Sequence, residues 1–251
     1  KKIINMHRFY HPNTININES LFMDNLSSHH ALKVMRVKIN DQIILFNGDG
    51  SDYQGKIINL KKNQIEVLII SKKVINNESN LKIRLLQALT SNDKMDWIIQ
   101  KTTELGISEI QPVICDRSII KIKDNKTEKK LMRWRQISIS ACEQCGRAKI
   151  PLIHSPQDLS SYLEKNRVFK GNLKIILSPD AKKNLNDIEF INTKQEIIVL
   201  IGPEGDFTKK ELELAIKKGF LSIQIGPRIL RTETAPISIL SILQYKYGDI
   251  V

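Results

Sequence analysis

Three loops in the second half of the chain carry residues whose types and spacing favour ligand binding. They are Leu177–Asp180, Gly202–Phe207 and Gly226–Ala235, and each follows a short apolar run that predicts a buried strand. In an open α/β sheet, ligands bind beyond the carboxyl ends of the strands. We therefore expect the three loops to meet at one edge of a sheet and to form a binding pocket.

The Gly202–Phe207 loop is suited to close contact between backbone and ligand, because Gly202 and Gly205 carry no side chain. The run Thr208–Glu211 that follows has the pattern of a capping box and predicts the start of a helix. The loop lacks the Lys-Ser/Thr of a phosphate-binding loop and the third Gly of a dinucleotide fingerprint. It favours a pocket for a flat adenine and a small amino acid, and a plain strand–turn–helix corner is the alternative.

The third loop has an unusual density of hydrogen-bonding groups, since Arg228–Ala235 combines two Arg, one Glu and two Thr with Ile229 and Leu230. Arg231 and Glu233 are the side chains best suited to chemistry. A cation stabilises a developing anion, and a carboxylate accepts a proton. The alternative is that Arg231 and Glu233 form an ion pair that fixes the loop.

The secondary structure that must position these loops differs between two parts of the chain, with mostly strands in the first and alternating strands and helices in the second. Short apolar runs between residues 39 and 70, with a turn at Asn47–Gly50, predict a small β-barrel. A short helix at His30–Met35, capped by Ser28, is expected before it. From residue 81 onward, strands alternate with helices, which predicts an α/β domain with a mainly parallel sheet.

The expected domains are a barrel at 1–72, a polar linker at 73–80 and an α/β domain at 81–251. In the α/β domain, short apolar runs predict the strands, and apolar residues at helical spacing predict the helices. The expected strands are Leu81–Ala88, Ile107–Cys115, Leu173–Leu177, Glu196–Ile201 and Leu221–Ile225. The expected helices are Asp96–Leu105 with Trp97 and Ile98 on one side, 127–147, a helix begun by Ser155 and Pro156, Thr208–Lys218 and Pro236–Tyr247.

Charge and cysteine content narrow the class of protein. Lys and Arg number 39 against 27 Asp and Glu, a net charge of +12 that favours a polyanionic partner such as nucleic acid. Three cysteines do not make a disulfide scaffold. Cys142 and Cys145 lie within a helical pattern, so we interpret them as structural and expect no metal site. No apolar run reaches the roughly 20 residues of a membrane span, so we expect a soluble, cytoplasmic protein.

The two Gly-containing loops together resemble a known family. Ile201-Gly202-Pro203-Glu204-Gly205 and the run Ile225–Ala235 are similar to the cofactor-binding end of the RsmE methyltransferases, which belong to the SPOUT class. The resemblance covers almost the full chain. It includes His7–Tyr10, His30–Asp41, Lys94–Trp97 with Lys101 and Glu104–Gly106, Arg117-Ser118, and Arg133-Trp134 through Glu143–Arg147. The family usually has Gly where Asp206 stands, so this chain adds a carboxylate beside the pocket.

The resemblance implies a SPOUT methyltransferase domain whose C-terminal segment threads a trefoil knot, preceded by a PUA-like β-barrel that binds RNA. It implies a homodimer that uses S-adenosylmethionine to methylate N3 of a uridine in 16S ribosomal RNA of the small ribosomal subunit. Such a transfer is an in-line displacement that needs alignment of donor and acceptor, without a metal. The alternatives are a SPOUT enzyme that methylates a ribose 2′-oxygen and a non-catalytic RNA-binding assembly factor.

The candidate site residues follow from the loops and the resemblance. Arg231, Glu233 and Arg8 are the candidates for catalysis. The expected cofactor-binding residues are Leu177, Leu200, Ile201, Gly202, Pro203, Glu204, Gly205, Ile225, Gly226, Ile229, Leu230, Thr232 and Ala235. The expected RNA-binding residues are Arg8, Phe9, Arg36, Lys94, Arg117 and Arg147.

Overall fold

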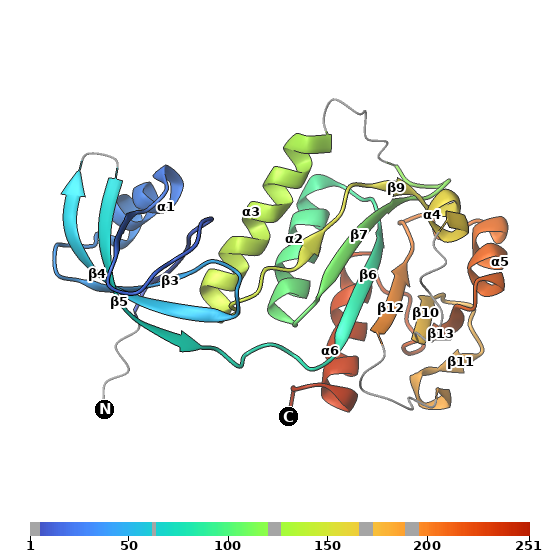
Figure 1. The fold of residues 1–251 in the computed structure, drawn as a ribbon. Coiled ribbons are helices and arrows are strands. Elements are labelled where there is room, and N and C mark those ends of the chain that lie inside the picture. Colours follow the sequence, from blue (N-terminus) through green and yellow to red (C-terminus); the bar gives the residue numbers. More distant parts are fainter. Residues whose placement is uncertain (1–5, 62–63, 120–126, 166–172, 189–195) are drawn as a thin grey trace. The chain divides into compact units, whose positions relative to one another are not determined.

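The computed structural model describes residues 6–61, 64–119, 127–165, 173–188 and 196–251. The chain divides into two compact units (Figure 1). The first comprises Lys1–Glu78 and Cys142–Ile150, and the second comprises Ser79–Ala141 and Pro151–Val251. A segment from the middle of the sequence, Cys142–Ile150, therefore belongs to the N-terminal unit. The domain limits expected from the sequence, at residues 72 and 81, stay predictions.

The first unit is built on a five-stranded sheet with the order β1-β3-β4-β5-β2. Its strands are β1 (Arg8–Tyr10), β2 (Ser20–Phe22), β3 (Gln42–Phe46), β4 (Ser51–Lys61) and β5 (Gln64–Val74). The first two were not expected from the sequence, and β5 runs on to Val74, into residues expected to form a linker. Alternate side chains such as Ile43, Leu45 and Val67 are fully buried and make the core of this unit.

The short helix of the first unit begins earlier than predicted. Helix α1 (Asn25–His30) continues directly into a π-helical turn, η1 (Ala31–Met35). Asp24 is the capping residue, because its Oδ1 accepts hydrogen bonds from the backbone N–H groups of Leu26 and Ser27 at 2.9 and 3.0 Å. The predicted cap, Ser28, is instead buried inside the helix and donates to the Met23 carbonyl.

The second unit holds the parallel sheet that the sequence predicts. Its order is β11-β13-β10-β12-β6-β7-β8, with β9 also beside β7, and the recorded pairings are all parallel. The strands are β6 (Lys82–Ala88), β7 (Glu109–Ile114), β8 (Leu152–Ile153), β9 (Gln157–Asp158), β10 (Leu173–Leu177), β11 (Lys183–Asn184), β12 (Glu196–Ile201) and β13 (Leu221–Gln224). The expectation of an α/β fold is confirmed.

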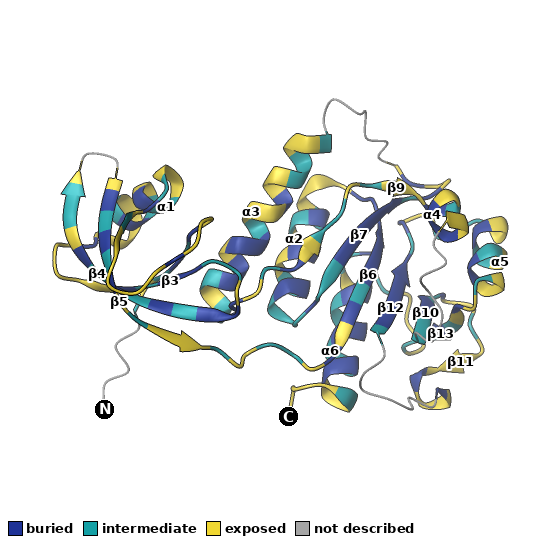
Figure 2. Cartoon of the chain, in the orientation of Figure 1, coloured by how far each residue is buried: buried dark blue, intermediate teal, exposed yellow. Residues whose placement is uncertain are grey.

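Helices cover both faces of this sheet (Figure 1). One cluster of buried side chains joins the sheet to α2 (Asn92–Glu104), α3 (Thr127–Cys145) and α6 (Thr234–Tyr247). A second cluster joins the opposite face to α4 (Leu159–Lys165) and α5 (Lys209–Lys217). The strands at the centre of the sheet are buried along most of their length (Figure 2).

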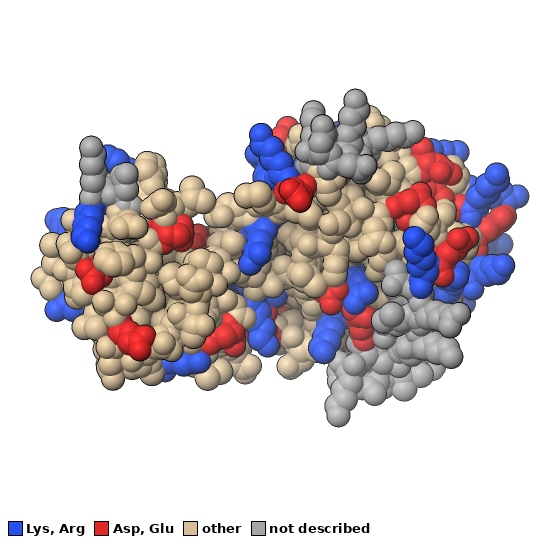
Figure 3. Space-filling model, turned by 45° about the horizontal axis from the view of Figure 1, so that its top comes forward, with Lys and Arg blue, Asp and Glu red and all other residues tan. Residues whose placement is uncertain are grey.

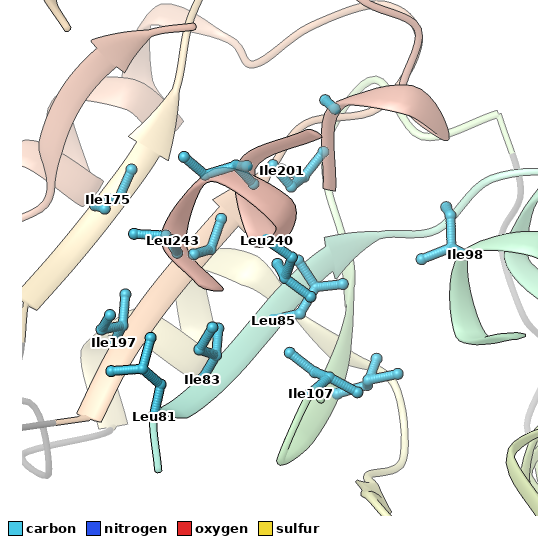
Figure 4. Packing of buried hydrophobic residues seen from close by; sticks show 14 of the residues in the cluster. Leu81, Ile83, Leu85, Ile98, Ile107, Ile175, Ile197, Ile201, Leu240 and Leu243 are labelled. Atoms are coloured by element: carbon cyan, nitrogen blue, oxygen red, sulfur yellow. The ribbon is translucent and has the colours of Figure 1, made fainter. Parts of the chain in front are cut away.

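Strand β12 shows how one run of apolar residues supplies both cores. Ile197, Val199 and Ile201 belong to the cluster that contains α6, and Figure 4 shows Ile197 and Ile201 in that packing. Ile198 and Leu200 belong to the cluster with α4 and α5. Successive side chains of a strand point to opposite faces, so this division follows directly from the strand geometry.

Two helices differ from the predicted pattern. Helix α4 begins at Leu159, because the residues after Ser155 and Pro156 form the short strand β9 first. On α2 the buried side contains Ile98 but not Trp97, which is 50% exposed and has the Lys101 ammonium 5.1 Å from its ring centroid. The capping box at the start of α5 is confirmed, since Thr208 and Glu211 exchange the two expected hydrogen bonds.

The cysteines of α3 have a structural setting. Cys142 is buried, and burial raises the pKa of its thiol to about 12, so the thiol is protonated and unreactive at neutral pH. Among the described residues, no three His, Cys, Asp or Glu side chains are grouped so that they could hold a metal ion. In the same ranges, none of the helices has the length and apolar character that a bilayer crossing requires.

Helix α6 is held in place by a buried amide. Gln244 is fully buried, its Nε2 donates to the Leu105 carbonyl at 2.9 Å, and its Oε1 accepts from Ser79 Oγ at 2.7 Å. These bonds connect α6 to the end of α2 and to the segment that enters β6. The position of α6 matters because its first turn begins at Thr234 and so contains the end of the Gly226–Ala235 loop.

We expect Gln244→Ala to lower the free energy of unfolding by about 2 kcal/mol, because it removes a fully buried amide and both of its partly buried hydrogen bonds, those to the Leu105 carbonyl and the Ser79 hydroxyl. Urea denaturation measures the change. Gln100→Ala, an exposed glutamine on α2, is the control and should change stability by less than about 0.5 kcal/mol. An equal effect of the two substitutions would contradict the role given to Gln244.

Candidate functional site

A cavity of about 390 Å³ lies beyond the carboxyl ends of β10, β12 and β13, where the sequence predicts a pocket. Its size lies in the range of small-molecule sites. The second unit provides every residue of its wall. The lining residues are Lys94, Leu177, Ser178, Pro179, Ile201, Gly202, Pro203, Glu204, Asp206, Ile223, Gln224, Ile225, Gly226, Arg228, Ile229, Leu230, Arg231, Thr232 and Ala235.

Most residues expected to bind a cofactor line this cavity. They are Leu177, Ile201, Gly202, Pro203, Glu204, Ile225, Gly226, Ile229, Leu230, Thr232 and Ala235. Two others are not among the lining residues. Leu200 packs on the opposite face of the sheet, in the cluster with α4 and α5. Gly205 is backed by Arg117, whose Nη1 donates to the Gly205 carbonyl at 3.0 Å, so this glycine provides room for an arginine.

A partly buried hydrogen bond joins the two Gly-containing loops. Thr232 Oγ1 donates to the Gly202 carbonyl at 2.7 Å, and the same hydroxyl accepts from Gln87 Nε2 at 3.2 Å. Thr232 is 6% exposed and Gln87 is fully buried. A hydroxyl can donate and accept at once, so Thr232 connects β6, the loop after β12 and the segment before α6.

A cluster of charged groups lies at the polar side of the cavity. The Glu204 carboxylate accepts a hydrogen bond from Thr90 Oγ1 and another from Lys94 Nζ at 3.0 Å. The same ammonium lies 3.3 Å from Oε2 of Glu233. Lys94 is thus held between two carboxylates, one on the cavity wall and one at the start of α6.

The contacts of this cluster stabilise the charged forms of Lys94 and Glu204. The hydrogen bond to Glu204 raises the pKa of Lys94. Burial acts to raise the pKa of Glu204, but hydrogen bonds from Thr90, from the backbone and from Lys94 outweigh it, and the pKa is lowered. Lys94 therefore carries a positive charge at neutral pH and Glu204 a negative one, so neither is suited to exchange a proton.

Of the candidates for catalysis, Arg231 lies on the cavity wall and Glu233 lies beside the cavity. Arg231 lines the cavity and is exposed, and its guanidinium has no hydrogen bond or ion pair to another described residue. Glu233 pairs with Lys94, so the alternative of an Arg231–Glu233 ion pair is wrong. Glu233 is not among the lining residues and is adjacent to the cavity through Lys94. Arg228 is also exposed on the wall.

Sequence reasoning missed part of the polar wall. Thr90 was not expected at the site, although it follows β6 by two residues and lies beyond the carboxyl end of that strand. The rule that directed attention to β10, β12 and β13 applies equally to β6. Lys94 was expected only as an RNA contact, because the sequence gives no sign that its helix begins beside the Gly202–Phe207 loop.

Several residues expected to touch RNA have structural roles in the first unit. Arg8 donates from Nε to Asp52 at 3.2 Å and from Nη1 to the Cys142 carbonyl at 2.7 Å, with its guanidinium over Phe46. Phe9 is 1% exposed, so its ring is not available to stack on a base. Arg147 is buried and paired with Glu78 at 2.8 Å.

The other candidates for RNA contact are accessible. Arg36 is exposed at the end of η1, and Arg117 is exposed although it donates to the backbone of the Gly202–Phe207 loop. On the face that Figure 3 shows, Lys and Arg side chains are interspersed with Asp and Glu and do not form one continuous patch. The positive charge is therefore distributed over this face.

The pKa shift of Glu204 has a consequence for stability at acid pH. A carboxyl with a lowered pKa stabilises the fold above its unfolded-state pKa of about 4.3, and this contribution is lost as the pH falls through the folded-state value. We expect Glu204→Gln to be less stable than wild type at pH 7, with a difference that shrinks below about pH 4. Urea denaturation at both pH values measures it.

Glu213→Gln is the control, because Glu213 is exposed on α5 and 3.9 Å from Lys209, which is more exposed still. Its difference from wild type should stay small at both pH values. A Glu204→Gln variant whose deficit grew in acid would show that the Thr90–Glu204–Lys94 contacts do not stabilise the carboxylate.

Comparison with known proteins agrees with this geometry. The family model for an RNA methyltransferase domain matches residues 77–244, and the model for an RNA methyltransferase PUA domain matches residues 27–70. The chain is 36% identical to ribosomal RNA small subunit methyltransferase E of Buchnera aphidicola subsp. Schizaphis graminum, over 97% of each chain. It is 31% identical to the Bacillus subtilis protein of that name, over 87% of each.

Two solved structures are similar over the whole fold. A methyltransferase of Legionella pneumophila in complex with the cofactor SAM has a TM-score of 0.93 at 38% identity, covering 98% of this chain and 100% of that one. Ribosomal RNA small subunit methyltransferase E of Neisseria gonorrhoeae bound to S-adenosyl methionine has a TM-score of 0.90 at 36% identity, with the same coverage. With its cavity at the strand ends and its PUA domain, this chain belongs to the RNA methyltransferase family of ribosomal RNA small subunit methyltransferase E.

Proposed function

We propose that the protein transfers a methyl group from S-adenosylmethionine to N3 of a uridine in 16S ribosomal RNA. The observation that carries this proposal is the cavity formed by the three strand-end loops, with Arg231 on its wall and no partner for that arginine among the described residues. Its support from comparison is that the Neisseria gonorrhoeae enzyme, which shares the fold, is bound to S-adenosyl methionine. The relatives named above are ribosomal RNA small subunit methyltransferases.

The residues present fit the proposed donor. Apolar side chains of Leu177, Ile225, Leu230 and Ala235 offer walls for an adenine ring. Gly202 and the other loop residues bring backbone donors and acceptors to the cavity edge. S-adenosylmethionine, when bound, supplies a methyl group on a positively charged sulfur. The chain's own task is to hold the acceptor nitrogen in line with that methyl group.

Methyl transfer to N3 of uracil needs a cation beside the base and a group that takes up the N3 proton. N3 of uracil carries a proton at neutral pH, and the base becomes more anionic as that proton leaves. Arg231 is the cation proposed to stabilise the negative charge on the uracil ring, because its guanidinium is exposed at the cavity and has no partner among the described residues. Glu233, held beside the cavity by Lys94, is the proposed proton acceptor.

The finer features expected from the family belong to the same proposal. We infer a trefoil knot in the C-terminal segment, supported by the bond from Thr232 to Gly202 that packs the last loop against the loop after β12. We also infer a barrel-like PUA domain, a homodimer, and a cytoplasmic location with the small ribosomal subunit as partner. Lys94, Arg36 and Arg117 are the proposed RNA contacts, whereas Arg8, Phe9 and Arg147 are assigned to structure.

The function is tested by incubating the protein with S-adenosylmethionine and unmodified small-subunit RNA or subunits, followed by mass spectrometry of the nucleosides. The expected product is 3-methyluridine. Gly202→Val should bind the donor too weakly to react, because an added Cβ already lies 3.0 Å from the Phe207 ring and the larger side chain shifts the loop. Calorimetry and circular dichroism separate lost binding from lost folding. A ribose-methylated product would refute the N3 assignment.

Replacing Arg231 tests the proposed cation. We expect Arg231→Gln to lower methyl transfer about 100-fold, because the charge that develops on uracil loses its stabilising partner. Donor affinity by calorimetry should change less than about twofold. The variant's rate should also continue to rise at pH values where the wild-type rate has levelled off. Lys209→Gln, at an exposed position of α5, is the charge-matched control. Equal rates for both variants would remove Arg231 from the mechanism.

A further inference from the structure

Asp206 has a backbone conformation that side-chain-bearing residues rarely adopt. Its φ is 61°, in the left-handed region that favours glycine. The conformation closes a tight turn, in which the Asp206 N–H donates to the Pro203 carbonyl at 3.0 Å. Such outliers concentrate at functional sites, where the surrounding structure holds them in place. Glycine would meet the backbone requirement without strain, so the aspartate side chain itself needs an explanation.

The side chain of Asp206 is oriented by its own loop. One carboxylate oxygen, Oδ1, accepts a hydrogen bond from the Phe207 N–H at 2.8 Å. Phe207 is buried in the cluster beneath the loop, so this anchor is rigid. Oδ2 has no hydrogen bond to another described residue, and Asp206 is among the residues that line the cavity. One oxygen is therefore fixed and the other is available to a ligand.

Lys94, Arg228 and Arg231 line the same cavity as Asp206, yet none of them forms an ion pair with it. Two carboxylates line the cavity, and Glu204 already pairs with Lys94. Asp206 makes no ion pair with any cation in the parts of the chain that the structure describes. Arg117 lies behind the same turn, but its Nη1 donates to the backbone carbonyls of Gly205 and Phe207. An uncompensated carboxylate on a cavity wall favours a cationic group in the ligand.

We propose that Asp206 binds the α-ammonium group at the methionyl end of the donor. This inference rests on the proposed function, since it concerns the same cavity. The donor has two cationic groups, a sulfonium and an ammonium. An ammonium has three N–H donors and forms a charge-assisted hydrogen bond with a carboxylate oxygen, whereas a sulfonium has no such donor. The available Oδ2 of Asp206 matches the ammonium.

The two carboxylates of this turn, Glu204 and Asp206, have different roles. Glu204 accepts from Thr90 and from the Lys94 ammonium through Oε1, so its charge has a cationic partner, whereas Asp206 accepts from the backbone N–H of Phe207 and has no ion pair with a described residue. The ammonium is shared by S-adenosylmethionine and by the product S-adenosylhomocysteine. Asp206 therefore contributes to the affinity of both, and it distinguishes adenosyl compounds that carry the amino-acid end from those that lack it.

Isothermal titration calorimetry with three ligands tests the assignment. The ligands are S-adenosylmethionine, S-adenosylhomocysteine and 5′-methylthioadenosine, which has neither the ammonium nor the positive sulfur. We expect Asp206→Asn and Asp206→Gly to weaken binding of the first two about tenfold, and to leave the third within about twofold. Asp206→Gly also relieves the left-handed backbone, so weaker binding by this variant is not due to strain.

Asp180→Asn is the matched control, because Asp180 is exposed in a neighbouring loop and does not line the cavity. Its affinities should equal those of wild type. Three results would overturn the inference: unchanged affinities in both Asp206 variants, equal weakening for all three ligands, or weakening for S-adenosylmethionine alone, which would assign Asp206 to the sulfonium. Wild-type protein that binds none of the three would overturn the proposed function as well.

Discussion

The hydrogen bond from Thr232 Oγ1 to the Gly202 carbonyl is the contact on which the rest of the site depends. It holds the last loop of the sheet against the loop after β12, and Gln87 fixes the same hydroxyl from β6. Thr232 and Gln87 are buried, so the bond between them is shielded from water, and the bond to the Gly202 carbonyl is partly buried. Arg231 and Glu233 are the neighbours of Thr232 in the chain. Their positions relative to the Gly202–Phe207 loop therefore follow from this one buried hydroxyl.

The sequence predicts the edge of the sheet where the site lies but not which side chains face it. The apolar runs of β10, β12 and β13, each followed by a turn, were enough to locate the three loops. The choice between Leu200 and Ile201 could not be made, because β12 is buried on both faces and has no alternation of polar and apolar residues. Only the assembled sheet shows that Ile201 faces the cavity and Leu200 the helices α4 and α5.

Charge pairing was also beyond the reach of local sequence. Arg231 and Glu233 are two residues apart and of opposite sign, yet Glu233 pairs with Lys94, more than a hundred residues earlier. The turn before α6 places the two side chains in different surroundings, one exposed and one next to α2. The consequence is chemical as well as structural. Lys94 neutralises part of the carboxylate charge beside the cavity, and Arg231 keeps its charge available on the wall.

A net charge of +12 indicates a polyanionic partner but does not say which cations reach it. Arg8 and Arg147 count fully toward that charge, yet within the first unit Arg8 connects β1 to the Cys142–Ile150 segment and Arg147 connects that segment to Glu78. An arginine whose nitrogens are saturated by carboxylates and carbonyls has no donor left for a phosphate. The cations that matter for RNA are those with accessible nitrogens, and burial and pairing identify them where composition cannot. By that criterion the cavity wall, with Arg228 and Arg231, has more accessible positive charge than the core of the PUA domain.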